Sequence, residues 1–401
     1  MNKRKIFNDP VYGFITIPYE IVFDVIEHPY FQRLRRIQQL GMSSMVYPGA
    51  THTRFHHSLG AMHLMHRSLE VLKSKGIQIT EQESQAAILA ILLHDLGHGP
   101  FSHALEGILL KNYHHEDISI LLMDKLKMIA TEPIEMAIAI FKNTYPKKFL
   151  HQLVSGQLDM DRMDYLNRDS FYTGVSEGVI GYDRIINMLH VHHDNIVVEE
   201  KGIYSIEKFL VARRLMYWQV YLHKTSLVAD LMLKNAFLRA KELFQDGHKI
   251  SNMPSHLFAL LEENYKDENE LLSLFTQVDD ADAICSLKSF MLQDDEILKR
   301  LSSGLINRDL FKIEFLPENI ADEKYNQISP QFNEDERSYF LLNGEVMNNA
   351  YNPKKENIFI LFKDGSIRDI AEIAEQMNIR SLSNEVVKYY LAYPENNLVL
   401  N

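Results

Sequence analysis

The feature that most constrains this chain is a run of eight apolar residues followed at once by two ionisable ones. Residues 86–93 read Ala-Ala-Ile-Leu-Ala-Ile-Leu-Leu, and His94 and Asp95 come next. A helix that is apolar on every face is predicted to be buried all round. Because a buried carboxylate without a counter-charge costs several kcal/mol, His94 and Asp95 must be salt-bridged in the core or bound to a cation. The run therefore predicts a helical core with a charged site at one end.

A second helix is predicted to meet this one. It follows the segment 54–60, which contains His57, and it ends at Gly76. Its apolar positions share one face: Leu59, Met62, Leu69 and Leu72. Thr80 and Glu83 have the spacing of a capping box that starts the next helix, which ends at His94. His57 thus begins one helix and the His94-Asp95 pair ends the next, a geometry that can bring them together.

A third acidic segment spans residues 158–169. Helical spacing puts Asp161, Tyr165 and Asp169 on one stripe, so a ligand, an aromatic ring and a hydrogen-bond acceptor would point the same way. The alternative is a solvated acidic helix, with Asp159 and Asp164 as its main members. Together, His57, His94, Asp95 and Asp161 offer nitrogen and carboxylate donors that suit Mn, Fe, Zn, Ni or Mg. Ligand identity does not choose among these divalent metals.

The chain resembles the HD-domain phosphohydrolases and, within them, the deoxynucleoside triphosphate triphosphohydrolases. The resemblance covers roughly the first 240 residues. It rests on these segments: Asn8-Asp9-Pro10, 31–35, Gln39-Leu40-Gly41, 47–50, 54–60, 94–103, 159–169 and 221–224. It implies a mainly α-helical fold, an HD-domain helical bundle in which the same four residues hold the metal. The C-terminal third carries no recognisable motif.

The resemblance also implies substrate contacts. Tyr165 would lie against the deoxyribose, Asp169 would bind the 3′-hydroxyl, and Arg162 would bind phosphate. The further residues that match the family's sugar and triphosphate contacts are Gln39, Leu40, Arg54, Arg213, Tyr221 and Lys224. Tyr217 shares the helical spacing of Arg213, Tyr221 and Lys224, and we expect it to pack rather than to bind.

General acid and base catalysis needs groups that titrate near neutrality, and His98, His103 and His115 are the candidates. His115 resembles an active-site histidine of the family. Glu106 stands where the resembled enzymes have a shorter Asp that supports a histidine. The sequence does not say which histidine protonates the leaving oxygen.

Charge and cysteine content exclude several classes. The net charge of −12 argues against nonspecific nucleic-acid binding and against an anionic membrane surface. The single cysteine, Cys285, excludes an intrachain disulfide and a thiolate zinc cage. The N-terminus lacks the apolar core of a signal peptide and no apolar run reaches transmembrane length, so we expect a cytoplasmic protein.

We divide the chain into a catalytic region, residues 1–240, and a C-terminal region, residues 241–401. A β-hairpin is expected near residues 191–204, with His190, His192 and His193 as surface residues. The C-terminal region should be helical with a small α/β appendage, formed by a strand at 357–362 and a helix at 367–377, for which assembly is the expected role. Its acidic runs, 267–270 and 279–282, are interpreted as solvated.

The leading hypothesis is metal-dependent cleavage of a dNTP at the α-phosphate, giving a deoxynucleoside and triphosphate. The alternatives are hydrolysis of another nucleotide phosphate ester and a nucleotide-binding regulatory module without turnover. The family also implies a homo-oligomer, a dimer or a tetramer. Glu27, Gln32 and Arg35 fall in the segment through which nucleotides activate the vertebrate member.

Overall fold

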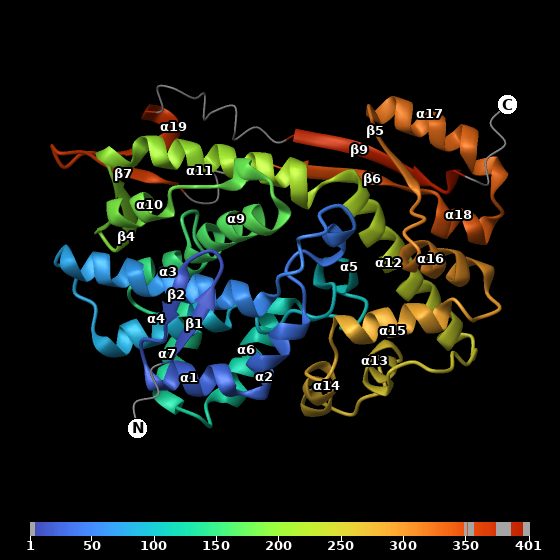
Figure 1. Ribbon diagram of the computed structural model, residues 1–401, viewed down its shortest axis with the longest axis horizontal. Coiled ribbons are helices and arrows are strands. Elements are labelled where there is room, and N and C mark those ends of the chain that lie inside the picture. Colours follow the sequence, from blue (N-terminus) through green and yellow to red (C-terminus); the bar gives the residue numbers. More distant parts are fainter. Residues whose placement is uncertain (1–4, 349–350, 352–356, 374–385, 396–401) are drawn as a thin grey trace.

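The computed structural model describes residues 5–348, 351, 357–373 and 386–395. The fold is mainly helical with small sheets, as predicted (Figure 1). The helices up to residue 245 are α1 (Glu20–Glu27), α2 (Pro29–Gln32), α3 (Arg54–Ser74), α4 (Glu81–Leu93), α5 (Ser102–Leu105), α6 (His115–Leu126), α7 (Thr131–Phe141), α8 (Lys148–Ser155), α9 (Met160–Thr173), α10 (Tyr182–Met188), α11 (Ile203–Met216) and α12 (Lys224–Gln245). Short 3-10 turns are η1 (Arg33–Arg36), η2 (Gly41–Met45), η3 (Ser176–Gly178) and η4 (Glu200–Gly202).

Helix α4 lies in the core. Each of its residues from 86 to 93 is fully buried, and the helix packs against α3 and α7. The Thr80–Glu83 capping box forms at its start as predicted. The predicted inner face of α3, which includes Leu59 and Leu69, is buried too. The sequence prediction of two core helices that bracket the charged site is therefore confirmed.

Helix α9 packs closely across α3. A Cβ at Gly60 would lie 1.9 Å from Oδ1 of Asp164, so only glycine allows this approach. A hairpin of β1 (Ile6–Asp9) and β2 (Gly13–Thr16) closes the same region. Asp9 binds the buried Arg168 of α9 at 2.8 Å. The N-terminal hairpin thus fixes the helix that carries the third acidic segment.

The second half of the chain adds helices and two sheets. The helices are α13 (Ser255–Leu261), α14 (Glu268–Phe275), α15 (Asp280–Phe290), α16 (Glu296–Ile306), α17 (Glu318–Ile328), α18 (Glu334–Phe340) and α19 (Ile370–Ile373), with a 3-10 turn η6 (Ser329–Gln331). The strands are β3 (Leu189–His192), β4 (Asn195–Glu199), β5 (Lys312–Leu316), β6 (Leu342–Asn348), β7 (Phe359–Leu361), β8 (Ile367–Asp369) and β9 (Val386–Tyr393). One sheet has the order β5-β9-β6 and the other β3-β4-β7-β8.

The β3-β4 hairpin forms as predicted, and β7 pairs in parallel with β4. A strand from residues 359–361 therefore joins the sheet that the 189–199 hairpin begins. The helix predicted for 367–377 is wrong at its start, because residues 367–369 return as β8 after a turn at Gly365, whose φ is +82°. Residues 370–373 form α19, and the rest of that prediction lies outside the described residues.

The two acidic runs differ. The first, near Asp267, is exposed and caps α14 as expected. The second is not solvated, because Asp279 and Asp280 are 7% and 8% exposed. Asp279 caps α15 and pairs with Arg36, which is remote in sequence. The prediction was wrong because a local charge pattern does not reveal the distant partner, Arg36.

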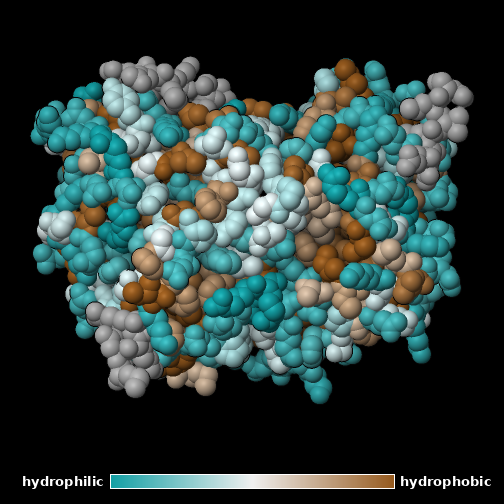
Figure 2. Space-filling view, in the orientation of Figure 1, coloured by the Kyte–Doolittle hydropathy of each residue, from teal (hydrophilic) through white to brown (hydrophobic). Residues whose placement is uncertain are grey.

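Helices α11 and α12 are joined by a π-helical turn, η5 (Tyr217–Tyr221). Trp218 in this turn contacts Lys388 of β9, with the ammonium 3.9 Å from a ring centroid. In Figure 2 the face shown is largely hydrophilic, with apolar residues in separate patches. Among the described residues no helix is both long and apolar enough for a membrane span.

Candidate metal and active site

The predicted ligands from three helices converge. Nε2 of His57 lies 3.1 Å from Oδ1 of Asp161 and 3.4 Å from Nε2 of His94. Nε2 of His94 lies 3.5 Å from the same oxygen of Asp161. Donors about 2.1 Å from one ion are separated by roughly 3.0–3.4 Å in octahedral or tetrahedral geometry. The spacing of these three groups fits a single divalent metal.

Both imidazole rings are oriented by hydrogen bonds at Nδ1, the ring nitrogen opposite the one that faces the site. Nδ1 of His57 contacts Oδ2 of Asp164 at 2.7 Å, and Nδ1 of His94 contacts the carbonyl oxygen of Ile91 at 2.6 Å. These acceptors require Nδ1 to carry the hydrogen, so each neutral ring presents its Nε2 lone pair to the site. This is the tautomer that binds a metal through Nε2.

The charges at the site also favour a cation. Burial opposes protonation of His57, yet hydrogen bonds to Asp161 and Asp164 raise its pKa to about 10. In the same way the pKa of His94 is raised, against burial, by the carboxylates of Asp95 and Asp161. Surplus negative charge at a buried site attracts positive charge, which a divalent metal supplies when it replaces the protons. Donor type, spacing and charge therefore all fit a metal.

Asp95 borders this cluster. Its Oδ1 lies 3.3 Å from Nε2 of His94 and its Oδ2 lies 3.8 Å from Nε2 of His57. The buried guanidinium of Arg54 donates to Asp95 at 2.5 Å and to the hydroxyl of Ser102 at 3.1 Å. Arg54, expected at the phosphates, is thus also the residue that fixes Asp95.

One of the predicted catalytic histidines, His98, contacts Asp95, and the other two lie near His98. His98 is 3.2 Å from Oδ1 of Asp95 through Nε2, and its ring stacks on that of His115 with centroids 4.1 Å apart. Burial and the nearby Arg54 lower the pKa of His98 well below its usual value. His98 is therefore neutral at neutral pH. His103 is exposed, with its ring centroid 6.1 Å from that of His98.

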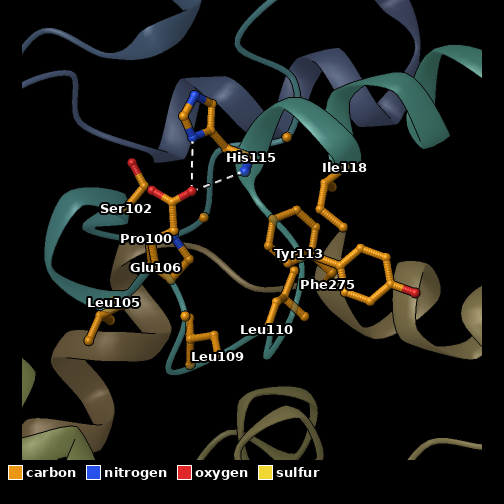
Figure 3. Close-up of a pocket in the computed structure, with 13 residues that line it drawn as sticks. Pro100, Ser102, Leu105, Glu106, Leu109, Leu110, Tyr113, His115, Ile118 and Phe275 are labelled. Atoms are coloured by element: carbon orange, nitrogen blue, oxygen red, sulfur yellow. Dashed lines mark hydrogen bonds and ion pairs between the residues drawn. The ribbon is translucent and has the colours of Figure 1, made fainter.

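Glu106 does pair with a histidine despite its extra methylene. Its Oε1 lies 3.0 Å from Nδ1 of His115 and accepts the backbone N–H of the same residue at 3.1 Å (Figure 3). Behind this pair is a cavity of about 30 Å³, lined in part by Tyr113 and Phe275. That volume holds a water molecule and not a nucleotide, so the cavity is a packing void behind the Glu106–His115 pair.

The sugar-binding residues of the prediction also cluster. Asp169, 1% exposed, accepts the hydroxyl of Tyr221 at 2.8 Å and contacts Nε2 of His52 at 2.7 Å. The rings of Tyr165 and Tyr221 meet edge to face, with centroids 5.9 Å apart. Oε1 of Gln39 is buried without a partner among the described residues. A buried orphan acceptor of this kind calls for a ligand or a water molecule.

The remaining predicted substrate ligands, three for phosphate and one for the sugar, have other surroundings. Arg162 donates to Asp159 and to the carbonyl of Gly156, so it is held within its own helix start. Arg213 contacts Gln157 at 3.2 Å. Lys224 is exposed at the start of α12, and Leu40 is half-buried. The single stripe expected for residues 213–224 is interrupted, because the π turn and the break at Leu222 shift its register.

Two important residues escaped the sequence prediction. Asp164, a main member of the alternative solvated acidic helix, is instead fully buried between His57 and Arg168. Its spacing to Arg168, four residues on, is the signal that could have found it. His52 is buried and stacks on Tyr172 while it binds Asp169. Nothing in the sequence pattern pointed to His52.

A helical bundle that directs two Nε2 lone pairs and a carboxylate to one point fits the class of metal-dependent enzymes. Comparisons narrow this class. Residues 54–169 match the model of the HD domain, and residues 180–258 match that of the HD associated region. A solved phosphohydrolase from Bacteroides thetaiotaomicron is 50% identical, with a TM-score of 0.90, over 98% of this chain and 100% of that one. The chain belongs to the HD-domain phosphohydrolases.

Two further relatives differ in what is known of them. The uncharacterized protein YwfO of Bacillus subtilis is 33% identical over 92% of this chain and 88% of its own length. A deoxynucleoside triphosphate triphosphohydrolase SAMHD1 homolog of Dictyostelium discoideum is 32% identical over 66% of this chain and 56% of its own length.

Proposed function

We propose that this protein hydrolyses dNTPs at the α-phosphate and releases a deoxynucleoside and inorganic triphosphate. The observation that carries the proposal is the buried Asp169, held on both sides by Tyr221 and His52. It lies two helical turns from Asp161, on the same face of α9. A rigid acceptor at this distance from a metal ligand suits a sugar hydroxyl better than a second phosphate.

The metal would be held by His57, His94 and Asp161, with Asp95 as the fourth ligand. When bound, a divalent ion polarises a phosphoryl oxygen and lowers the pKa of a water molecule. Arg54 keeps Asp95 in place. Arg213 and Lys224, and Arg162 once it leaves Asp159, would neutralise the triphosphate.

We assign the general acid to His115. Glu106 fixes its Nδ1 and would stabilise the protonated ring, and a third of the His115 side chain is exposed. His98 is held by Asp95 and Ser102 at both ring nitrogens, so it orients its neighbours and does not exchange protons. His103 remains at the rim.

The sugar pocket supports deoxyribose as the substrate. The orphan Oε1 of Gln39 offers an acceptor, Leu40 an apolar contact, and the edge-to-face rings of Tyr165 and Tyr221 an aromatic wall for the sugar. The similarity to relatives named deoxynucleoside triphosphate triphosphohydrolases, such as those of Dictyostelium discoideum and Gallus gallus, points the same way. We further propose a homo-oligomeric, cytoplasmic enzyme, which light scattering and cell fractionation would test.

Product analysis tests the proposal. The purified protein is incubated with each dNTP and with GTP, with Mn or Mg, alone and in mixtures. Asp95→Ala serves as the inactive variant, and Asp183→Ala, which removes an exposed carboxylate paired with Arg67, serves as its control. We expect deoxynucleoside and triphosphate from the wild type and from Asp183→Ala only. Release of monophosphate, or turnover of a different phosphate ester alone, would refute this specificity.

A further inference from the structure

Asp280 connects two distant segments of the catalytic region. Its Oδ1 accepts the backbone N–H of Phe101 at 3.1 Å, and its Oδ2 accepts the backbone N–H of Gln38 at 2.7 Å. The side chain is buried, and among the described residues it forms no ion pair. A buried carboxylate bound only by two amides is an expensive arrangement, so these two contacts require an explanation.

Helix capping does not explain them. Asp279 is the cap of α15, since its carboxylate accepts the N–H of Ala281, and Asp282 completes the capping box. The carboxylate of Asp280 points away from its own helix. Burial raises the pKa of Asp280 to about 6, so the group is ionised at neutral pH and both oxygens accept. An amide side chain would offer one acceptor to the two N–H donors.

Phe101, the first contact, lies between two candidate catalytic histidines, His98 and His103. Its φ is 42° and its ψ is 47°, the left-handed region that a phenylalanine rarely adopts. Such a conformation costs of order 1–3 kcal/mol and persists only when the surroundings hold it. The hydrogen bond from the Phe101 amide to Asp280 is one such restraint on the loop that follows His94 and Asp95.

Gln38, the second contact, begins the segment of the proposed sugar contacts. Gln38 pairs with Thr53 in an isolated antiparallel bridge, and the next amide, of Gln39, donates to the carbonyl of His52 at 3.0 Å. This short pairing precedes Arg54 and the start of α3. Asp280 therefore restrains the strand that sets Gln39, His52 and Arg54 relative to one another.

Two further residues, Arg33 and Phe275, make contacts between the α14–α15 turn and the loop that contains His98. The fully buried Arg33 donates to the carbonyl of His98 at 2.8 Å and to that of Val278 at 2.9 Å. Its guanidinium lies 4.4 Å from the ring centroid of Phe275. The same ring comes within 3.3 Å of a Cβ built at Gly99. The turn between α14 and α15 thus contacts the histidine loop at backbone and side chain.

We propose that Asp280, from the C-terminal region, is a positioning residue that sets the histidine loop and the Gln38–Leu40 segment in register with each other. The inference rests on the proposed function only in naming what those two segments bind. It gives Asp280, which lies beyond residue 240, an indirect part in catalysis. The acidic run is a structural part of the site.

The test compares Asp280→Asn with Asp282→Asn, a matched change on the same helix turn that leaves Phe101 and Gln38 untouched. Amide hydrogen exchange is followed by mass spectrometry in peptides 36–42 and 97–105, with peptide 86–93 as the monitor of global unfolding. Turnover of dGTP is measured on the same samples. Phe275→Leu, which trims the contact with Gly99, is a second variant.

We expect Asp280→Asn to speed exchange in both peptides, but not in 86–93, and to lower kcat at least tenfold. Asp282→Asn should stay within twofold of wild type in kcat. Phe275→Leu should loosen peptide 97–105 and leave 36–42 unchanged. Unchanged exchange in Asp280→Asn, or a kcat within twofold of the Asp282→Asn value, overturns the inference. A wild-type protein without any dNTP turnover refutes the proposed function, and the exchange results then decide the role of Asp280 alone.

Discussion

Asp164→Asn tests whether the carboxylate that holds Nδ1 of His57 supports metal binding. The carboxylate of Asp164 accepts from Nδ1 of His57 at 2.7 Å and from Nε and Nη2 of Arg168 at 2.9 and 3.0 Å. His57 and Arg168 reach the same oxygen, Oδ2. An asparagine whose amide oxygen replaces Oδ2 keeps the hydrogen bonds from Nδ1 of His57 and Nε of Arg168. Its amide N–H group then faces Nη2 of Arg168, where both groups are donors, and the negative charge is lost.

The magnitude follows from the contacts that change. Loss of one hydrogen bond to a charged group costs about 1.5–3 kcal/mol of stability. A partner that orients a metal-binding histidine and raises its basicity is worth roughly 10–100-fold in metal affinity. That is about 1.4–2.7 kcal/mol of binding free energy. We therefore expect a folded but less stable protein with a 10–100-fold higher Kd for Mn.

Isothermal titration of Mn into each metal-free protein measures this effect directly. The matched control is Asp183→Asn, which removes the same charge from an exposed ion pair with Arg67. Surface pairs contribute little, so its Kd should stay within twofold of wild type. If Asp164→Asn bound Mn with wild-type affinity and only its melting temperature fell, Asp164 would be a fold residue and the argument from orientation would fail.

Two further changes have expected outcomes. Burial opposes ionisation of Glu83, but hydrogen bonds from Lys147, from the Thr80 amide and from Tyr145 hold its pKa below the usual 4.5. Its stabilising effect is therefore present above about pH 4.5 and is lost as the pH falls through the folded pKa. Between pH 7 and 3 the melting temperature of Glu83→Gln should fall less with pH than that of wild type. An equal fall in both proteins would contradict this. Tyr221→Phe removes a hydrogen bond to a charged acceptor worth about 1.5–3 kcal/mol, so kcat/KM for dGTP should fall about tenfold or more. The preference for dGTP over GTP should be kept, because phenylalanine retains the aromatic ring. Loss of that preference would refute the role given to the ring.

Local patterns were enough to predict the core of this fold. The apolar run 86–93, the capping box at Thr80 and the helix that starts near His57 all act within one or two turns of helix, and the structure confirms each of them. The approach of His57 to His94 was also predicted, because two helices joined by a short turn bring their ends together, whereas the place of Asp161 beside them was implied by the family resemblance.

Partners remote in sequence could not be predicted in this way. The acidic run 279–282 was interpreted as solvated, but Asp280 accepts from the Gln38 amide, 242 residues away. Asp164 likewise contacts His57, 107 residues away. Strand β8 was mistaken for a helix because its pairing with β7 depends on a turn at Gly365 and on a sheet begun by β4. In each case tertiary contacts, absent from any short window, decide the burial and conformation of the residue.

The π turn between α11 and α12 carries the only tryptophan of the chain, Trp218, three residues before Tyr221. Its indole lies against the ammonium of Lys388, while Tyr221 reaches Asp169 from the same turn. Excitation at the red edge of the protein's absorbance, where tyrosines do not contribute, therefore samples one place in the molecule. Emission from that place gives a label-free optical signal from the turn that holds Tyr221 against Asp169, suited to stopped-flow recording.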